Sequence, residues 1–252
     1  MRVEANQGYV LHRRDYRETS LLLEVFSLAY GRVALVARGA RRRRTPRFCP
    51  LQPFRPLQVG WVGRGDLVTL TSAEECGPGI RLMGRKLLSG LYLNELLMRL
   101  LLRQDPHPEL FVAYGQTLEL LGQAAQEEPV LRLFEKRLLE ELGYALVLER
   151  EAETGALIQG DAVYYYQSGK GPVLAKPVSA PSMRIHGRTL ISLRESVLDE
   201  PIILRELKVL MRFLLAPLIG ERPLQIRQLF QEKRRDTGYT VRTTEKRLDY
   251  HD

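Results

Sequence analysis

The chain has 252 residues, 44% of them hydrophobic and 27% charged, which is ordinary for a soluble globular protein with two or three compact units. Two cysteines are too few for a disulfide framework, and the net charge of +8 favours an anionic partner, nucleic acid before membrane. The N-terminus has no apolar signal core and no apolar run is long enough to span a bilayer, so we expect a cytoplasmic protein.

The first 80 residues predict a small barrel of five strands. The sequence predicts strands at residues 7–16, 20–28, 33–38, 50–62 and 66–73, with a period of two in β-branched and apolar residues at 33–38 and a clean alternation at 66–73. Pro53 and Pro56 favour an edge position or a bulge for the fourth strand. Five strands in about 75 residues indicate a closed barrel or a sandwich, and the OB-fold is the five-stranded barrel that commonly binds oligonucleotides.

Arginines gather around the first and third strands of this barrel. Residues 1–80 hold 13 arginines, no lysine and seven acidic residues, so this third of the chain carries six of the eight net positive charges. A short basic run is usually a solvated loop, but guanidinium groups also bind phosphate in a bidentate way. We therefore predict that these arginines bind the DNA backbone: Arg13, Arg14, Arg17, Arg38, Arg41, Arg42, Arg43, Arg44 and Arg47.

From residue 80 onward the apolar spacing becomes helical. Stripes at three- and four-residue intervals predict helices at residues 81–103, 110–121, 128–142, 190–198 and 202–219, with a last amphipathic turn within 222–232. The pattern is weaker between them, where short strands are expected at 156–166 and 173–175. The predicted division is therefore an OB-fold DNA-binding domain at 1–79, a helical domain at 80–144 and 186–232, a small region at 145–185 and a polar tail at 233–252.

No nucleophile, metal-ligand or phosphate-loop motif occurs in the sequence. The four histidines are far apart in unrelated contexts, and none pairs with a cysteine or a carboxylate at ligand spacing. Tyr164, Tyr165 and Tyr166 could stack on bases, but alternate tyrosines in a strand are more often core and rim residues. We therefore expect a binding protein rather than an enzyme. An RNA-binding OB-fold protein, or a nuclease with an unrecognised carboxylate site, remain the alternatives.

Several segments together resemble the bacterial RecO family of recombination mediators. The most specific is the run Val10-Leu11-His12-Arg13-Arg14-Asp15-Tyr16-Arg17-Glu18-Thr19-Ser20, followed by the basic end of the third strand. Further similar segments are residues 31–33, 37–41, 52–54, 65–67, 92–97, 110–111, 134–139 and 142–144, and less closely 220–227. The resemblance implies an OB-fold, a helical domain, binding of single- and double-stranded DNA, strand annealing, and RecA loading together with RecR and single-strand binding protein. It also implies a protein associated with the nucleoid.

The resemblance also raises two questions about sites outside the barrel. Many family members carry four cysteines after the Leu-Gly-Tyr stretch that hold zinc, whereas residues 146–158 here contain none, so we predict no zinc and no other cofactor. The family binds the acidic tail of single-strand binding protein through its helical domain. Arg132, Lys136 and Arg137 border an apolar stripe on the third predicted helix and are candidates for that contact. A solvated amphipathic helix explains them at least as well.

Overall fold

Five strands close into a barrel at the N-terminal end of the computed structural model, which describes residues 1–41, 51–226 and 229. They are β1 (Arg2–Tyr16), β2 (Ser20–Ser27), β3 (Gly31–Ala37), β4 (Pro56–Val62) and β5 (Leu67–Glu75). The order around the barrel is β1-β2-β3-β5-β4, with β4 paired to β1 and β3 parallel to β5. The expected OB-type barrel is confirmed.

The alternation in β2 shows how the barrel is built. Leu21, Leu23 and Val25 point inward and are at most 8% exposed, in the core of the barrel. Phe26 points to the opposite face and is fully buried against the helices. Because successive side chains of a strand alternate between its faces, one short strand contributes to both cores.

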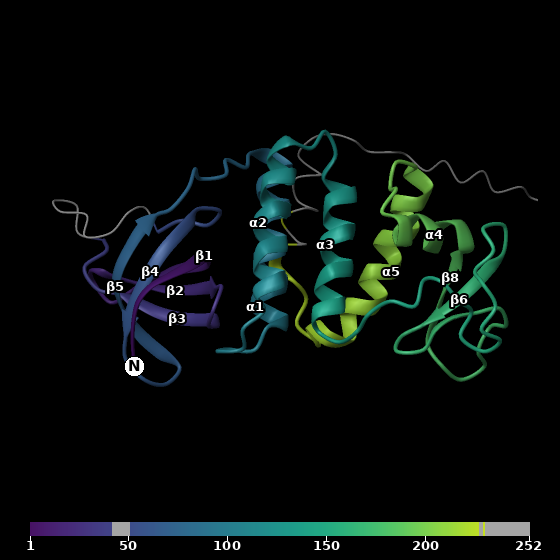
Figure 1. The fold of residues 1–252 in the computed structure, drawn as a ribbon, viewed down its shortest axis with the longest axis horizontal. Coiled ribbons are helices and arrows are strands. Elements are labelled where there is room, and N and C mark those ends of the chain that lie inside the picture. Colours follow the sequence, from purple (N-terminus) through teal and green to yellow (C-terminus); the bar gives the residue numbers. More distant parts are fainter. Residues whose placement is uncertain (42–50, 227–228, 230–252) are drawn as a thin grey trace, which may run out of the picture.

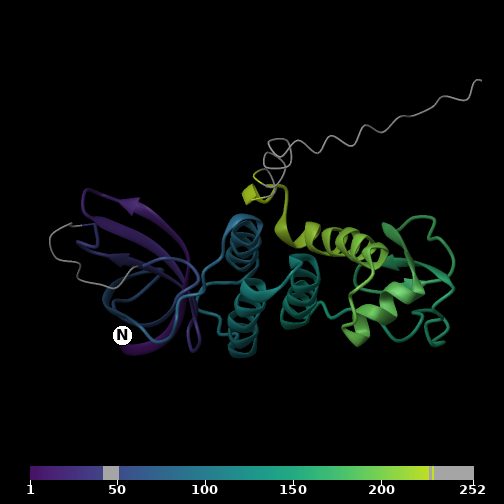
Figure 2. The same cartoon turned by 90° about the horizontal axis from the view of Figure 1, so that it is seen from above.

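Helices and a small sheet make up the rest of the described chain. The helices are α1 (Gly84–Leu100), α2 (Pro108–Gln123), α3 (Glu127–Glu141), α4 (Gly187–Glu195) and α5 (Pro201–Ile219). The sheet has the order β7-β6-β8, from β6 (Val163–Gln167), β7 (Gly171–Val173) and β8 (Ser182–His186). Figures 1 and 2 show an elongated molecule with the barrel at one end, the small sheet at the other and the helices between them. The predicted α+β fold is confirmed.

Three predicted details were wrong. Residues 51–55 precede the fourth strand, which begins at Pro56, where a missing N–H is tolerated; β4 is paired on both sides and is not an edge, although its pairing with β5 has a register shift at Gly60 and Trp61 of the kind that a bulge makes. The first helix begins at Gly84, three residues later than expected. Strand β8 was not predicted, since Ser182–His186 is largely polar and gains its structure by pairing with β6.

The barrel and the helices are joined by buried polar and aromatic contacts. Asn94 of α1 donates from Nδ2 to the Leu11 carbonyl of β1 at 2.8 Å, and its Oδ1 accepts from the Tyr114 hydroxyl of α2 at 2.6 Å. The Phe26 and Phe111 ring centroids lie 5.4 Å apart. At another point, Gly31 adopts a φ of +62°, and a Cβ there would lie 1.9 Å from the Asp105 carbonyl oxygen. Only glycine allows this approach of the two domains.

Candidate nucleic-acid interface

Arg17 and Arg41 meet at one end of the barrel, where the β1–β2 turn lies beside the end of β3. The Arg41 amide donates to the Thr19 carbonyl at 3.0 Å. Its guanidinium Nη1 lies 3.3 Å from the Glu18 carbonyl and 3.4 Å from the Arg17 carbonyl. Arg17 itself sits in the left-handed region, with a φ of 52°, and its guanidinium carbon lies 5.2 Å from the centre of the Tyr16 ring. Two arginines separated by 24 positions are thus held together by backbone contacts.

The other described arginines of the predicted set are close to this turn in the strand register. Arg38 follows Ala37, which pairs with Leu21 at the start of β2. Arg13 and Arg14 occupy successive positions of β1, so their side chains leave opposite faces of the strand, and Arg13 Nη1 lies 3.4 Å from the Leu51 carbonyl. We call the exposed residues Arg13, Arg14, Arg17, Arg38 and Arg41 the arginine surface. The remaining predicted arginines, Arg42, Arg43, Arg44 and Arg47, lie outside the described residues.

Carboxylates neutralise little of the arginine surface. Asp15 lies 2.9 Å from Arg41 Nη2, with 68% and 38% of the two side chains exposed. Among residues 1–41, 51–226 and 229, no carboxylate lies within ion-pair distance of Arg13, Arg14, Arg17 or Arg38. An exposed ion pair contributes about 0–1 kcal/mol, so a phosphate group can compete with Asp15 for Arg41. The surface therefore retains its positive charge.

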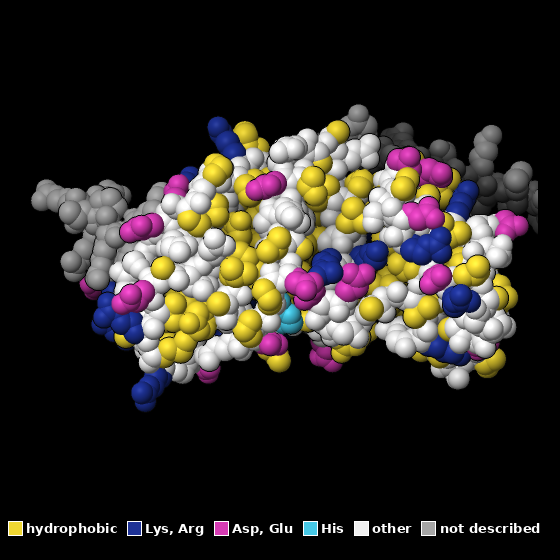
Figure 3. All heavy atoms as spheres, viewed as in Figure 1, with side chains coloured by type: hydrophobic (Ala, Val, Ile, Leu, Met, Phe, Trp, Pro, Cys, Tyr) yellow, Lys and Arg dark blue, Asp and Glu magenta, His cyan; other side chains and the backbone are white. Residues whose placement is uncertain are grey.

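The three cations predicted on α3 are placed differently from one another. Arg132 is 6% exposed and donates from Nη2 to Glu135 Oε1 at 2.7 Å. Lys136 Nζ lies 3.5 Å from the Leu193 carbonyl. Arg137 is half-buried and pairs with Glu109 and, at 2.6 Å, with Glu141. Over α3 the space-filling view shows positive and negative side chains next to each other (Figure 3). Lys136 and Arg137 are the accessible members of this set.

Two of the three tyrosines of β6 are buried in the core that they share with the helices. Tyr164 and Tyr166 are 2% and 3% exposed. Their hydroxyl oxygens accept hydrogen bonds from the Gln159 amide at 2.9 Å and the Val147 amide at 3.0 Å. Burial raises the pKa of Tyr166 to about 12. Tyr165 lies between them and is only half-buried, so the interpretation of the three tyrosines as core and rim residues is confirmed.

A carboxylate organises the segment in which related proteins are expected to hold zinc. Glu151 is 3% exposed, and its Oε2 accepts from the Thr154 hydroxyl at 2.6 Å, the Thr154 amide at 2.5 Å and the Glu153 amide at 3.0 Å. The Thr154 hydrogen bonds are the main cause of the lowered pKa of Glu151. Within the described ranges, no three His, Cys, Asp or Glu side chains are grouped as metal ligands. The donor set of this segment does not fit zinc.

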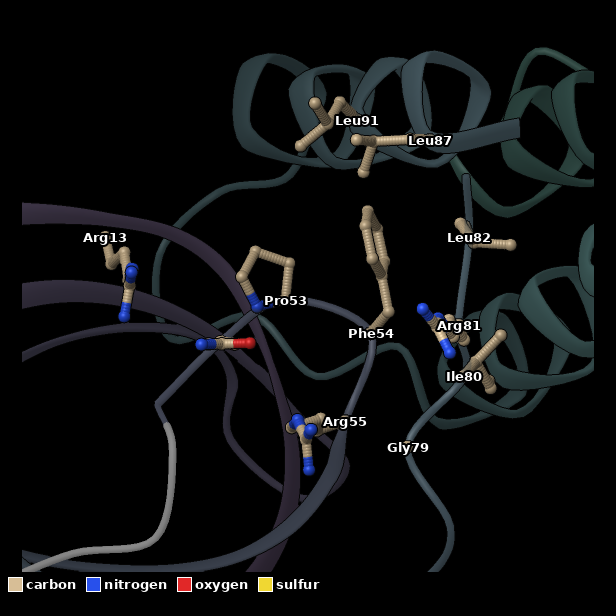
Figure 4. A pocket seen from close by; sticks show the side chains of 11 residues that line it. Arg13, Pro53, Phe54, Arg55, Gly79, Ile80, Arg81, Leu82, Leu87 and Leu91 are labelled. Atoms are coloured by element: carbon tan, nitrogen blue, oxygen red, sulfur yellow. The ribbon is translucent and has the colours of Figure 1, made fainter. Parts of the chain in front are cut away.

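A pocket of about 780 Å³ opens between the barrel and α1, and we call it the junction pocket (Figure 4). Three arginines line it, namely Arg13 of the arginine surface together with Arg55 and Arg81. The sequence interpretation missed Arg55 and Arg81, because they lie 26 positions apart and only the packing of residues 79–82 beside residues 52–55 brings them together. No spacing pattern in the sequence signals this pocket.

The fold and its basic end define a class: an α+β protein built on an OB-type barrel with an arginine-rich rim. Family models described as "Recombination protein O N terminal" and "Recombination protein O C terminal" match residues 1–78 and 81–220. The chain belongs to the RecO family of DNA repair proteins, as the sequence motifs had indicated.

Named relatives support this assignment over nearly the whole chain. A protein of Nitrosococcus oceani named "DNA repair protein RecO" is 50% identical over 235 residues, which cover 93% of this chain and 96% of the relative. Relatives with the same name from Methylococcus capsulatus and Alkalilimnicola ehrlichii are 47% and 45% identical, over 91% and 92% of this chain and 94% and 92% of their own lengths. None of the helices in the described part of the chain has the length and apolar content needed to cross a bilayer.

Proposed function

We propose that this protein is a recombination mediator that binds single- and double-stranded DNA and anneals complementary strands. In this role it helps to load RecA, together with RecR, on single strands coated by single-strand binding protein. The observation that carries the proposal is the arginine surface: exposed arginines whose backbone positions lie near one end of an OB-type barrel, with a carboxylate partner described only for Arg41. The protein acts by binding and has no catalytic site in this proposal.

The physical role of the arginine surface is to lower electrostatic repulsion. Each DNA strand carries one negative charge per phosphate, so two strands repel each other as they approach. Guanidinium groups that contact both strands neutralise part of this charge and release counterions. Because such contacts are made to phosphate and not to base edges, binding and annealing should depend little on sequence.

Salt dependence tests where the DNA binds. If the arginines contact roughly six phosphates of a single strand, log K should fall with log salt at a slope of about −4. Replacing Arg41, Arg42, Arg43 and Arg44 with alanine should flatten the slope by about 0.7 for each lost contact. Arg205 and Arg212, exposed on α5, provide a matched control, since alanine at these positions should leave the slope unchanged. An unchanged slope in the fourfold variant would move the DNA site elsewhere.

The partner surface on α3 is part of the same proposal. Lys136 and Arg137 can offer positive charge to the acidic tail of single-strand binding protein, beside the half-buried Leu133. Replacing both with alanine should weaken binding of a tail peptide by about tenfold and leave DNA affinity unchanged. Arg132 is unsuitable for this test because it is buried against Glu135. Tail binding that survives the double substitution would remove α3 as the site.

The domain division and the absence of zinc are also proposed. The family matches, which end at residue 78 and resume at residue 81, support a boundary near residue 80. The Glu151-centred turn supports a small region that is stable without metal. Stoichiometric zinc in the purified protein would contradict this. Magnesium-dependent cleavage of labelled DNA, or preference for structured RNA over single-stranded DNA, would favour the nuclease or the RNA-binding alternative.

A further inference from the structure

The junction pocket exists because a loop residue of the barrel is wedged against α1. Phe54 is 5% exposed and has a φ of 66°, and its carbonyl accepts from the Ile80 amide at 2.9 Å. Gly90 of α1 makes room for it, since a Cβ there would lie 2.9 Å from the ring of Phe54. The segments before β4 and before α1 are therefore fixed side by side, and the pocket between them is preformed.

The charged lining of the pocket is entirely positive. Arg13 lies on one side of Pro53 and Phe54 and Arg81 on the other, while Arg55 lies at the edge (Figure 4). Arg55 is held by Glu75 at 2.5 Å, whereas neither Arg13 nor Arg81 has an ion-pair partner within the described residues. No lining residue is acidic. Two of the three guanidinium groups are therefore available to an anionic ligand.

The opposite wall of the pocket is apolar. Leu87 and Leu91 extend from α1 toward Phe54 (Figure 4). Leu87 is 38% exposed and Leu91 is half-buried, so their methyl groups are accessible from the cavity. The pocket is an open cleft, and its volume of about 780 Å³ lies within the usual range of about 300–1,000 Å³ for small-ligand sites. A ligand that fits must combine negative charge with a flat or apolar group.

We propose that the junction pocket binds an unpaired nucleotide of single-stranded DNA, with phosphates of the strand on Arg13 and Arg81, on the two sides of Pro53 and Phe54, and with the base against Leu87 and Leu91. This inference rests on the proposed function and adds a route for the strand, from the arginine surface onto α1. Arg13 carries that continuity, because it belongs to both the arginine surface and the pocket. A base of a duplex stays stacked and paired, so the pocket selects single strands.

An acidic peptide with an apolar end is the competing occupant. The shared Arg13 favours DNA, since a strand bound along the arginine surface reaches the pocket without leaving its phosphate contacts. Apolar and aromatic platforms beside a positive groove are also how proteins hold single strands without reading their sequence. Binding of such a peptide in the junction pocket in place of DNA would contradict the proposal.

Two substitutions separate the base contact from the phosphate contact. Leu87→Gln keeps a good helix former at a partly exposed position and removes the apolar wall. It should lower affinity for a single-stranded oligonucleotide by about fivefold, with duplex affinity and salt slope unchanged. Arg81→Ala should flatten the single-strand slope by about 0.7. The matched controls are Leu120→Gln on α2, which is 54% exposed, and Arg85→Ala on α1, since neither residue lines the pocket.

The assay is fluorescence anisotropy of labelled single-stranded and duplex oligonucleotides over a salt series, with circular dichroism to verify that each variant is folded. Loss of single-strand affinity in Leu87→Gln but not in Leu120→Gln supports the proposal. Equal affinity of Leu87→Gln and the wild type for the single-stranded oligonucleotide overturns the proposal. If alanine substitutions in the arginine surface still weaken DNA binding in that case, the proposed function stands. Weakened binding of an acidic, apolar-ended peptide with unchanged DNA binding also overturns the proposal and assigns the pocket to a peptide.

Discussion

Asn94 is the buried residue on which the union of barrel and helices depends most directly. It is 2% exposed and joins the Leu11 carbonyl of β1 to the Tyr114 hydroxyl of α2. Asn94→Leu keeps the number of side-chain heavy atoms and leaves both groups buried without this partner. An unsatisfied buried polar group costs about 1–3 kcal/mol, so the variant should lose about 2–6 kcal/mol of unfolding free energy.

A double-mutant cycle isolates the contact with Tyr114. Tyr114→Phe removes the hydroxyl, so in the double variant one of the two unsatisfied groups no longer exists. Tyr114→Phe alone leaves Asn94 Oδ1 unsatisfied, and the double variant has neither this oxygen nor the hydroxyl, so the two single losses should together exceed the loss of the double variant by about 2–6 kcal/mol. Thr117→Ala is the control, because the Thr117 hydroxyl bonds only to the Ala113 carbonyl within α2 in the described contacts, and its cost should add to that of Asn94→Leu.

Two spectroscopic signals follow the two domains separately during urea denaturation. Trp61 is the single tryptophan of the chain and lies buried in β4, so its fluorescence reports on the barrel. Far-UV circular dichroism reports mainly on the helices. The wild-type transitions should coincide, and Asn94→Leu should separate them. Coincident transitions together with additive free energies in the cycle would refute the role given to Asn94.

Three further predictions concern the small region, the chain after α5 and the pocket wall. Hydrogen bonds from Thr154 lower the pKa of Glu151 in the folded state below its ordinary value of 4.5, so their stabilisation is present above about pH 4.5 and is lost as the pH falls through the folded-state pKa. The difference in unfolding free energy between the wild type and Glu151→Gln, measured by urea titration, should therefore shrink in acid; a constant difference would contradict it. Glu95 accepts from the amides of residues 225 and 226 at 2.8 and 3.0 Å, so Glu95→Ala should accelerate hydrogen exchange at residues 224–226 at least tenfold, and unchanged exchange would count against the contact. Gly90→Ala should destabilise the protein by about 1–3 kcal/mol despite the higher helix propensity of alanine, because its Cβ meets Leu82 and Phe54; a more stable variant in thermal unfolding would show that the wall can yield.

The strands and helices with strong periodicity could be predicted from the sequence. Ser20–Ser27 is largely apolar on both faces because these faces enter two different cores, and the stripe of Pro201–Ile219 is buried along its length. Ser182–His186 could not be predicted, since its polar side chains carry no strand signal and the strand forms by pairing with β6. The spacing of apolar residues predicts a strand or helix only where the apolar side chains of that segment are the ones that become buried.

The sequence predicts which arginines belong to the candidate site, but it does not predict how they are placed relative to one another. The arginines around β1 and β3 stand out in the sequence, whereas the backbone contacts that tie Arg41 to the β1–β2 turn depend on strand register. Arg132 reads as a solvated cation in a helical pattern, yet it is buried because Glu135 lies one turn away and pairs with it. The junction pocket depends on the approach of two loops, which no local pattern encodes.

The central claim is that the arginine surface brings two DNA strands together. The direct measurement is the rate at which complementary oligonucleotides coated with single-strand binding protein pair in the presence of the purified protein, followed by fluorescence energy transfer between labels on the two strands. The wild type should accelerate pairing, and alanine at Arg17, Arg38 and Arg41 should remove most of the acceleration while Arg205→Ala leaves it intact. Pairing at the same rate with and without the wild-type protein would contradict the claim.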